Sequence, residues 1–222
     1  MIDGDAGRHV REAFAQVVDV AIDFGADLFL VAGDLFDHNR IAGDVIDFVY
    51  RQLARIPCRT VIIAGNHDNH EDDAVLARMD FANAGRHVLL IDDAGGALLE
   101  FPELHATVWG RCMLDHHPAH RPMAGSPPRT RDLWHIGMAH GFYAEDPNAD
   151  RSSLITPQEI AASGFDYLAL GHMHFHRQMR HGATLACYPG APVPYGYGEA
   201  GSMSLVELTP GEEPRATARV LS

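Results

Sequence analysis

The chain has 222 residues, of which 46% are hydrophobic, enough for one domain with a buried core, which we place at residues 1–222. No apolar run approaches the roughly 18–20 residues that a membrane span needs, and the first residues lack the basic and apolar regions of a signal peptide. The net charge of −13 at pH 7 disfavours a protein that binds nucleic acid with its whole surface.

Three cysteines lie far apart in the sequence and form no C-x-x-C pair: Cys58, Cys112 and Cys187. An odd number of cysteines at wide spacing is typical of free thiols in a reducing compartment. We therefore expect a cytoplasmic protein.

In the first half of the chain, apolar segments with helical spacing alternate with short, continuously apolar segments. The first helix is expected from about Arg8, and Gly25 is well placed to end it. Buried strands are predicted at 26–32, 60–64 and 87–91. Helices are predicted before Pro57 and at 72–84. This alternation predicts an α/β fold with a parallel sheet.

The second half of the chain has less helix and more strand. Strands are predicted at 97–101, 104–109, 133–139 and 166–170, and the tail from Thr184 alternates short strands with turns. The segment 112–131 is rich in Pro, His and Arg and is predicted to be a long loop, either a solvated one or a contact surface for a polyanion. Thr156, followed by Pro157 and Glu159, is a strong helix start.

Four polar clusters each follow directly on a predicted strand, where open α/β sheets place their ligand sites. They are Gly33-Asp34-Leu35-Phe36-Asp37, Gly65-Asn66-His67-Asp68, His140-Gly141 and Gly171-His172-Met173-His174. One such cluster would be a weak signal. Four of them, in this order and at the same edge of a sheet, indicate a specific site.

The residue types in these clusters suit divalent cations. The two carboxylate oxygens of Asp34 can bridge two ions, and the amide oxygen of Asn66 adds a neutral ligand. Three imidazoles, those of His140, His172 and His174, would complete the coordination. A mixed nitrogen and oxygen set favours Mn, with Fe or Zn as alternatives, over Mg or Ca. Two ions about 3.5–4 Å apart would clamp a phosphate and activate water.

These motifs resemble a known family. G-D-x-x-D, G-N-H-D, a lone His at a strand end and G-H-x-H are similar to the signature of calcineurin-like metallophosphoesterases. The run LFLVAGDLFD and the tail segments Tyr188-Pro189-Gly190 and Gly198-Glu199 look most like the DNA double-strand-break repair exonucleases of that family. The resemblance implies an α/β/β/α four-layer sandwich with mixed sheets. It also implies DNA as the substrate, an SMC-like ATPase partner and, as one oligomeric state, a homodimer.

The resemblance also assigns roles by matching position. Asp34 would bridge two metals, with Asn66, His140 and His172 on the second metal and His174 on the first. His67 would contact the phosphate and protonate the leaving oxygen. The carboxylates of Asp37 and Asp68 would orient an imidazole or a bound water.

The sequence departs from the family in one respect. The family's first strand ends in D-x-H and supplies two ligands to the first metal, but no D-x-H precedes the first predicted helix here. Asp3, Asp5 and His9 have the right elements at the wrong spacing. We therefore expect a missing first strand, an exposed sheet edge, one tightly bound metal, a weakly bound second one and little or no hydrolysis.

Three functions remain open. The first is a metal-dependent phosphodiesterase or exonuclease acting on DNA. The second is a phosphoesterase for small nucleotides or other small phosphoesters, which the acidic balance favours. The third is a non-catalytic, metal-binding relic or partner subunit, which the absent D-x-H favours.

Overall fold

The computed structural model of the protein describes residues 5–115, 117, 119–129, 132–193 and 200–221. The α-helices in this part of the chain are α1 (Asp5–Phe24), α2 (Gly43–Leu53), α3 (Val75–Arg78) and α4 (Pro157–Ala162). Two short 3-10 helices lie at Phe81–Asn83 and Pro102–Leu104. Asp3, Arg131, Gly198 and Glu199 are outside the described residues.

Apart from the unpredicted short strands at 142–143 and 154–155 and the unpredicted strand at 176–181, the strands follow the predicted order with small differences at their ends. They are β1 (Leu28–Ala32), β2 (Arg59–Ile63), β3 (Val88–Ile91), β4 (Ala97–Phe101), β5 (Ala106–Gly110), β6 (Trp134–His140), β7 (Phe142–Tyr143), β8 (Leu154–Ile155), β9 (Tyr167–Gly171), β10 (His176–His181), β11 (Thr184–Pro189), β12 (Ser202–Glu207) and β13 (Arg215–Val220).

Two main sheets carry the fold. The first has three parallel strands in the order β1-β2-β3, and the second has six strands in the order β10-β11-β9-β6-β5-β4. In the second sheet β5, β6, β9 and β11 run parallel, whereas β4 and β10 are antiparallel edge strands. The predicted mixed α/β architecture is confirmed. Within the described sheet, β1 pairs with β2 alone and is an edge strand, as expected.

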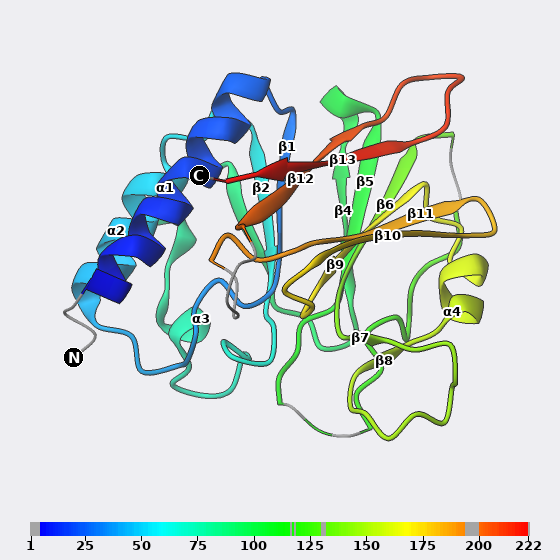
Figure 1. Ribbon diagram of the computed structural model, residues 1–222, viewed down its shortest axis with the longest axis horizontal. Helices are drawn as coiled ribbons and strands as arrows, with labels where there is room; N and C mark the ends of the chain where they lie inside the picture. Colours follow the sequence, from blue (N-terminus) through cyan, green and yellow to red (C-terminus); the bar gives the residue numbers. More distant parts are fainter. Residues whose placement is uncertain (1–4, 116, 118, 130–131, 194–199, 222) are drawn as a thin grey trace.

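Three hydrophobic clusters correspond to the three interfaces between four layers (Figure 1). The first cluster joins α1 and α2 to one face of the three-stranded sheet, with Val18 and Leu53 fully buried. The second lies between the two sheets and includes Val61 of β2 and Met138 of β6. The third packs the outer face of the six-stranded sheet against α4. Successive side chains of a strand point to opposite faces of the sheet, so neighbouring residues in one strand belong to different clusters.

Local signals explain where α1 and α4 end and begin. Gly25 has φ +70°, and its N–H donates to the Ile22 carbonyl while the N–H of Ala26 donates to Ala21, which closes the last turn of α1. At α4, the Thr156 side chain accepts from the Glu159 N–H and the Glu159 carboxylate accepts from the Thr156 N–H. Both predicted boundaries are confirmed, although α1 begins at Asp5 instead of Arg8.

The prediction of a helix at 72–84 was wrong. This segment contains the single turn α3, then an extended Met79 and Asp80, then a 3-10 helix. The Asp80 carboxylate accepts a hydrogen bond from the Ala82 N–H at 3.0 Å, so a local side-chain contact replaces the continued helix.

Candidate metal centre

The site lies where strands from both sheets end close together. β1 packs against β6 and β9 across the interface between the sheets, and His140 is opposite Gly171 in the parallel register of β6 and β9. Ile136, Met138 and His140 share one face of β6, so His140 extends the row that faces the first sheet. This arrangement brings the ends of β1, β6 and β9 to one place.

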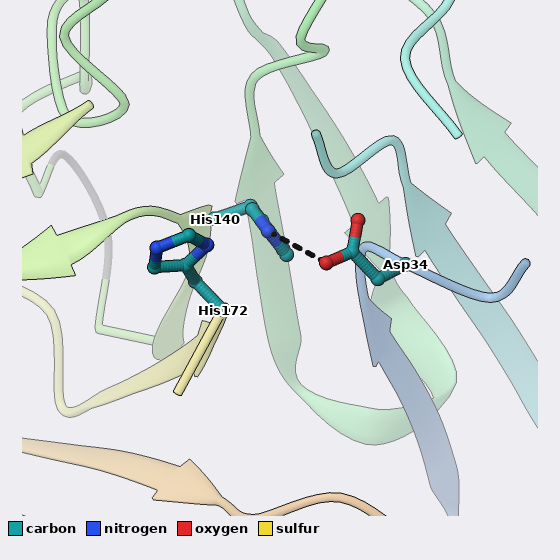
Figure 2. A group of neighbouring side chains, drawn as sticks. All are labelled: Asp34, His140 and His172. Atoms are coloured by element: carbon teal, nitrogen blue, oxygen red, sulfur yellow. Dashed lines mark ion pairs between the residues drawn. The ribbon is translucent and has the colours of Figure 1, made fainter. Parts of the chain in front are cut away.

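Three side chains converge at this edge: Asp34, His140 and His172 (Figure 2). Each offers a ligand atom within 4.8 Å of the others. The predicted amide joins them, because Asn66 Oδ1 lies 3.0 Å from His140 Nε2 and 2.9 Å from His172 Nδ1. The structure therefore brings together four of the five side chains that the sequence proposed as ligands.

His140 is held in one tautomer by the main chain. Its side chain is only 2% exposed, and its Nδ1–H donates to the Ala32 carbonyl at 2.8 Å. The opposite nitrogen, Nε2, then faces Asp34 Oδ2 at 3.2 Å and the Asn66 oxygen. Metal-binding histidines commonly fix their tautomer by such a bond to a carbonyl.

The electrostatics of the pair favour a positive charge between its members. Burial alone lowers the pKa of His140, but the hydrogen bond and charge of Asp34 outweigh it, and the pKa is raised above 6.5. Burial raises the pKa of Asp34, but the His140 contact and the His67 N–H outweigh it, and this pKa is lowered. Two oxygens that surround one imidazole nitrogen need either a proton or a cation between them.

The donor set fits a divalent cation. A carboxylate, an amide oxygen and two imidazoles are ligands that Mn, Fe and Zn accept, with fewer oxygens than Mg or Ca prefer. The residues present could hold one ion through Asp34, Asn66, His140 and His172. A bound cation would take the place of the shared proton on His140 Nε2.

Three glycines allow this convergence because a larger residue would collide there. A Cβ atom on Gly171 would lie 1.8 Å from the Ala32 carbonyl oxygen, and one on Gly65 would lie 2.2 Å from Asp34 Oδ1. A Cβ atom on Gly33, at φ +87°, would lie 2.4 Å from His140 Nδ1. Close packing of the chain therefore explains the glycines at 65 and 171. Gly33 is explained both by close packing and by its positive φ, which glycine adopts readily.

Backbone strain also marks the site. Asp34 has φ +54° and His172 has φ +103°, both in a region that residues with a side chain rarely adopt. Such conformations persist where the surrounding structure enforces them, and they concentrate at functional sites.

Asp68 supports the site through the backbone. Its side chain is fully buried, and its oxygens accept from the N–H groups of Gly65 at 2.7 Å, Asp34 at 3.1 Å and Phe36 at 3.3 Å. Burial raises the pKa of Asp68, and the N–H groups of Gly65 and Phe36 oppose that rise. The carboxylate thus joins the loop after β1 to the loop after β2, whereas the sequence suggested that it orients an imidazole or a water.

His67 and Asp37 lie together beside the cluster. The His67 ring is partly exposed and its Nδ1 lies 3.0 Å from the Asp37 carbonyl oxygen and 3.8 Å from its carboxylate. The His67 N–H donates to Asp34 Oδ1 at 2.8 Å. The main chain of His67 is therefore hydrogen-bonded to Asp34, and Nδ1 of its ring faces Asp37. Nε2, on the opposite side of the ring, points away from Asp37.

The fifth predicted ligand, His174, lies outside the cluster, as does His9, whose spacing does not fit D-x-H. His174 is two residues beyond His172 and is not among the three grouped side chains. His9 is an exposed residue of α1. The Ala32 carbonyl, which fixes the His140 tautomer, was not anticipated, because a backbone contact over 108 residues leaves no sequence signal.

The arginines of the long loop mainly bind their own chain. Arg111 donates to the carbonyls of Ala94 and Arg121, and Arg129 pairs with Asp166. Donors that already bind the protein's own carbonyl and carboxylate groups are less available to a polyanion. These contacts therefore count against a polyanion-binding surface on this loop.

The family signature of the calcineurin-like phosphoesterases matches residues 5–176, which is most of the chain. The chain belongs to this family. The predicted resemblance is therefore confirmed.

The curated relatives of this phosphoesterase include nucleases. It is 27% identical to a subunit of the nuclease SbcCD of Bacillus subtilis (strain 168) over 93% of this chain and 63% of that protein. It is 25% identical to the DNA double-strand break repair protein Mre11 of Methanopyrus kandleri, over 83% of this chain and 44% of that protein. The uncharacterized metallophosphoesterase YhaO of Bacillus subtilis is also 25% identical, over 81% of this chain and 45% of that protein. The phosphoesterase thus spans about half to two thirds of these relatives' lengths.

A solved structure supports the fold. The protein TT1561 of Thermus thermophilus superposes with a TM-score of 0.64 at 14% identity, covering 94% of this chain and 92% of that one. At this identity the likeness concerns the fold alone. Among the helices that the structure describes, none combines the length and apolar character needed to cross a bilayer.

Proposed function

We propose that this phosphoesterase is a metal-dependent phosphodiesterase that acts on DNA as an exonuclease. The observation that carries the proposal is the convergence of Asp34, Asn66, His140 and His172 around the buried Nε2 of His140. The likeness to nucleases over more than 80% of this chain supports DNA as the substrate.

The chain's own residues would hold the ion and position the phosphate. Asp34, Asn66, His140 and His172 hold a divalent cation, Mn in the first place and Fe or Zn as alternatives. When bound, the cation supplies Lewis acidity and lowers the pKa of water. Ala32 keeps His140 in the tautomer that presents Nε2, and Asp68 keeps the two loops at a fixed separation.

His67 would provide the proton for the leaving oxygen. Its main-chain N–H is fixed on Asp34 and its Nδ1 on the Asp37 carbonyl, so the ring is oriented from two sides. A positioned and partly exposed ring that carries a proton on both nitrogens can deliver the Nε2 proton to a substrate beside the cluster.

We further propose that one metal ion binds tightly and a second weakly. The 222 residues contain no D-x-H ahead of α1, so a second ion would have Asp34 and His174 as its predicted ligands. Two ligands are fewer than the three to four protein ligands that stable sites use. Hydrolysis by these residues alone should therefore be slow.

The assembly is part of the same proposal. One relative is by its name a subunit of a nuclease, SbcCD. We propose that this chain likewise works in the cytoplasm with a partner, an SMC-like ATPase, and that it can form a homodimer.

A phosphoesterase for small nucleotides is the second candidate. The net charge of −13 favours it, because a strongly acidic protein repels a long polyanion more than a small one. A non-catalytic, metal-binding subunit is a third candidate.

The test compares substrates in the presence of Mn²⁺. Wild type and His140→Gln are incubated with single-stranded DNA, a small phosphodiester and a small phosphomonoester. We expect slow Mn²⁺-dependent DNA cleavage that His140→Gln abolishes. Cleavage of small esters without DNA cleavage would favour the second candidate, and metal binding without any hydrolysis would favour the third.

A further inference from the structure

An arginine stands over an aromatic ring at the edge of the metal centre. The Cζ atom of Arg151 lies 5.5 Å from the centre of the Phe142 ring. The Phe142 ring in turn meets the His172 ring edge to face, with centres 6.4 Å apart. The sum of these two distances is therefore an upper limit for the distance between the Arg151 Cζ atom and the centre of the His172 ring. Neither Arg151 nor Phe142 takes part in the proposed reaction.

Arg151 differs from the arginines of this acidic protein that pair with carboxylates. Six arginines of the described chain form ion pairs with carboxylates: Arg11, Arg55, Arg59, Arg129, Arg180 and Arg215. Arg151 is exposed, and within the described residues its side chain has no carboxylate partner. A ring face attracts a guanidinium without using its N–H donors, so those donors remain available to a ligand.

Phe142 is fixed in place by the strand that carries it. The main-chain N–H of Phe142 donates to the Ser153 carbonyl at 2.9 Å, and the Tyr188 hydroxyl donates to the Gly141 carbonyl at 2.7 Å. A Cβ atom on Gly141 would lie 2.2 Å from the Ser153 oxygen, so β7 and the chain entering β8 are tightly packed. The ring is two residues from His140 and is held relative to the cluster.

We propose that Arg151, held by Phe142, binds a phosphate of a single DNA strand next to the phosphate at the Asp34–His140–His172 cluster. The inference rests on the proposed function. A guanidinium is suited to phosphate because it offers paired N–H donors in one plane. A small ester with a single phosphate cannot reach this subsite, so the contact would favour a polynucleotide over such an ester.

The charges around the subsite limit its strength. The segment that joins β7 to β8 also carries Glu145, Asp146 and Asp150, all exposed. Exposed carboxylates nearby weaken the attraction of a phosphate, and salt screens both effects. Arg151 therefore contributes one phosphate contact to a site that the metal cluster anchors.

The test measures binding of a fluorescent, phosphorothioate-linked oligothymidylate at several salt concentrations in the presence of Mn²⁺. Arg151→Gln should weaken binding by about tenfold and should flatten the plot of log affinity against log salt by about 0.7. Arg55→Gln is the matched control, because Arg55 precedes β2 at the opposite edge of the sheet and pairs with Asp19. It should leave affinity and salt slope unchanged.

Phe142 is tested as a positioning residue. Phe142→Leu should lower the affinity and flatten the salt slope as Arg151→Gln does, whereas Phe142→Trp should restore both, because indole also binds a guanidinium. Thermal unfolding verifies that each variant is folded.

Equal affinities and salt slopes for Arg151→Gln and Arg55→Gln would overturn the inference. Mn²⁺-dependent DNA cleavage by the wild type would leave the proposed function standing in that case. Absence of both oligonucleotide binding and cleavage in the wild type would count against the proposed function and the inference together.

Discussion

The Nδ1–H of His140 donates to the carbonyl oxygen of Ala32 at 2.8 Å, across 108 residues of sequence. This bond connects the last residue of β6 in one sheet to the last residue of β1 in the other. It determines which imidazole nitrogen faces the carboxylate of Asp34, and so which atom His140 would offer to a metal ion.

Replacing His140 should remove the metal site. His140→Gln should weaken Mn²⁺ binding by about 100-fold or more, since even the loss of an outer partner of a ligand costs about 10–100-fold. Isothermal titration calorimetry measures the affinity. His9→Gln, at an exposed position on α1, is the control and should bind Mn²⁺ like the wild type. Unchanged affinity in His140→Gln would rule out this cluster as the main site.

The number of ions can be counted directly. Titration of the wild type with Mn²⁺, followed by metal analysis after dialysis, should show one tight site and one weak site. The reason is that the second ion has only Asp34 and His174 as predicted ligands in these 222 residues. Two sites of equal, high affinity would contradict this prediction.

Asp68→Asn should destabilise the fold through the loops of the site. The amide can accept with one atom only, so at least one buried N–H among those of Gly65, Asp34 and Phe36 loses its partner. An unsatisfied buried group costs about 1–3 kcal/mol, and more when a charged partner is lost. Urea denaturation measures the loss. Asp92→Asn, at an exposed position, should change the free energy of unfolding by less than about 0.5 kcal/mol.

Gly171→Ala should separate the two sheets locally. Its Cβ atom would lie 1.8 Å from the Ala32 oxygen and 2.7 Å from His140 Nδ1, so the bond between these groups must lengthen or break. We expect a loss of about 2 kcal/mol or more in the free energy of unfolding, together with weaker Mn²⁺ binding. Gly43→Ala is the matched control, because a Cβ atom there meets nothing within 4 Å. It should be neutral or slightly stabilising.

Stability should depend on pH through His135, which lies away from the metal cluster. Its side chain is buried, its Nδ1 lies 2.9 Å from Thr107 Oγ1, and burial lowers its pKa below 6.5. Just below pH 6.5 the unfolded state therefore binds more protons, so the free energy of unfolding falls as the pH falls.

The measurement compares urea denaturation at about pH 7.5 and about pH 5.5. His135→Gln removes the titrating group, so its loss of stability between the two values should be smaller than that of the wild type. An equal loss in both proteins would show that His135 does not contribute.

Most of the layered fold could be predicted because its signals are local. Strands β1, β2, β3, β4 and β9 appear as short apolar runs, and the Thr156–Glu159 capping box is visible in four residues. The failure at 72–84 is also local in origin: Asp80 bonds to Ala82, and composition alone does not reveal which of two short-range contacts is preferred.

The candidate site was predictable in identity and not in detail. Asp34, Asn66, His140 and His172 stand at the carboxyl ends of parallel strands, where such sheets place their ligand sites. The sequence predicted one sheet edge, whereas the ends of strands from two sheets meet here. The role of Asp68 as a backbone anchor could not be seen, because it depends on contacts between residues 32 to 34 positions apart in sequence, in two loops that meet only after the sheet has formed.

The sequence by itself determined the alternation of strands and helices, the family and four of the residues that converge, because periodicity and short motifs encode them within a few residues. Only the tertiary structure decided the tautomer of His140, the exclusion of His174 from the cluster and the position of Arg151 over Phe142. The bond that fixes the tautomer joins residues 108 positions apart. It arises from the packing of two sheets against each other, which no short stretch of sequence specifies. Arg151 and Phe142 are nine positions apart, and the pairing of β7 with β8 brings their segments together.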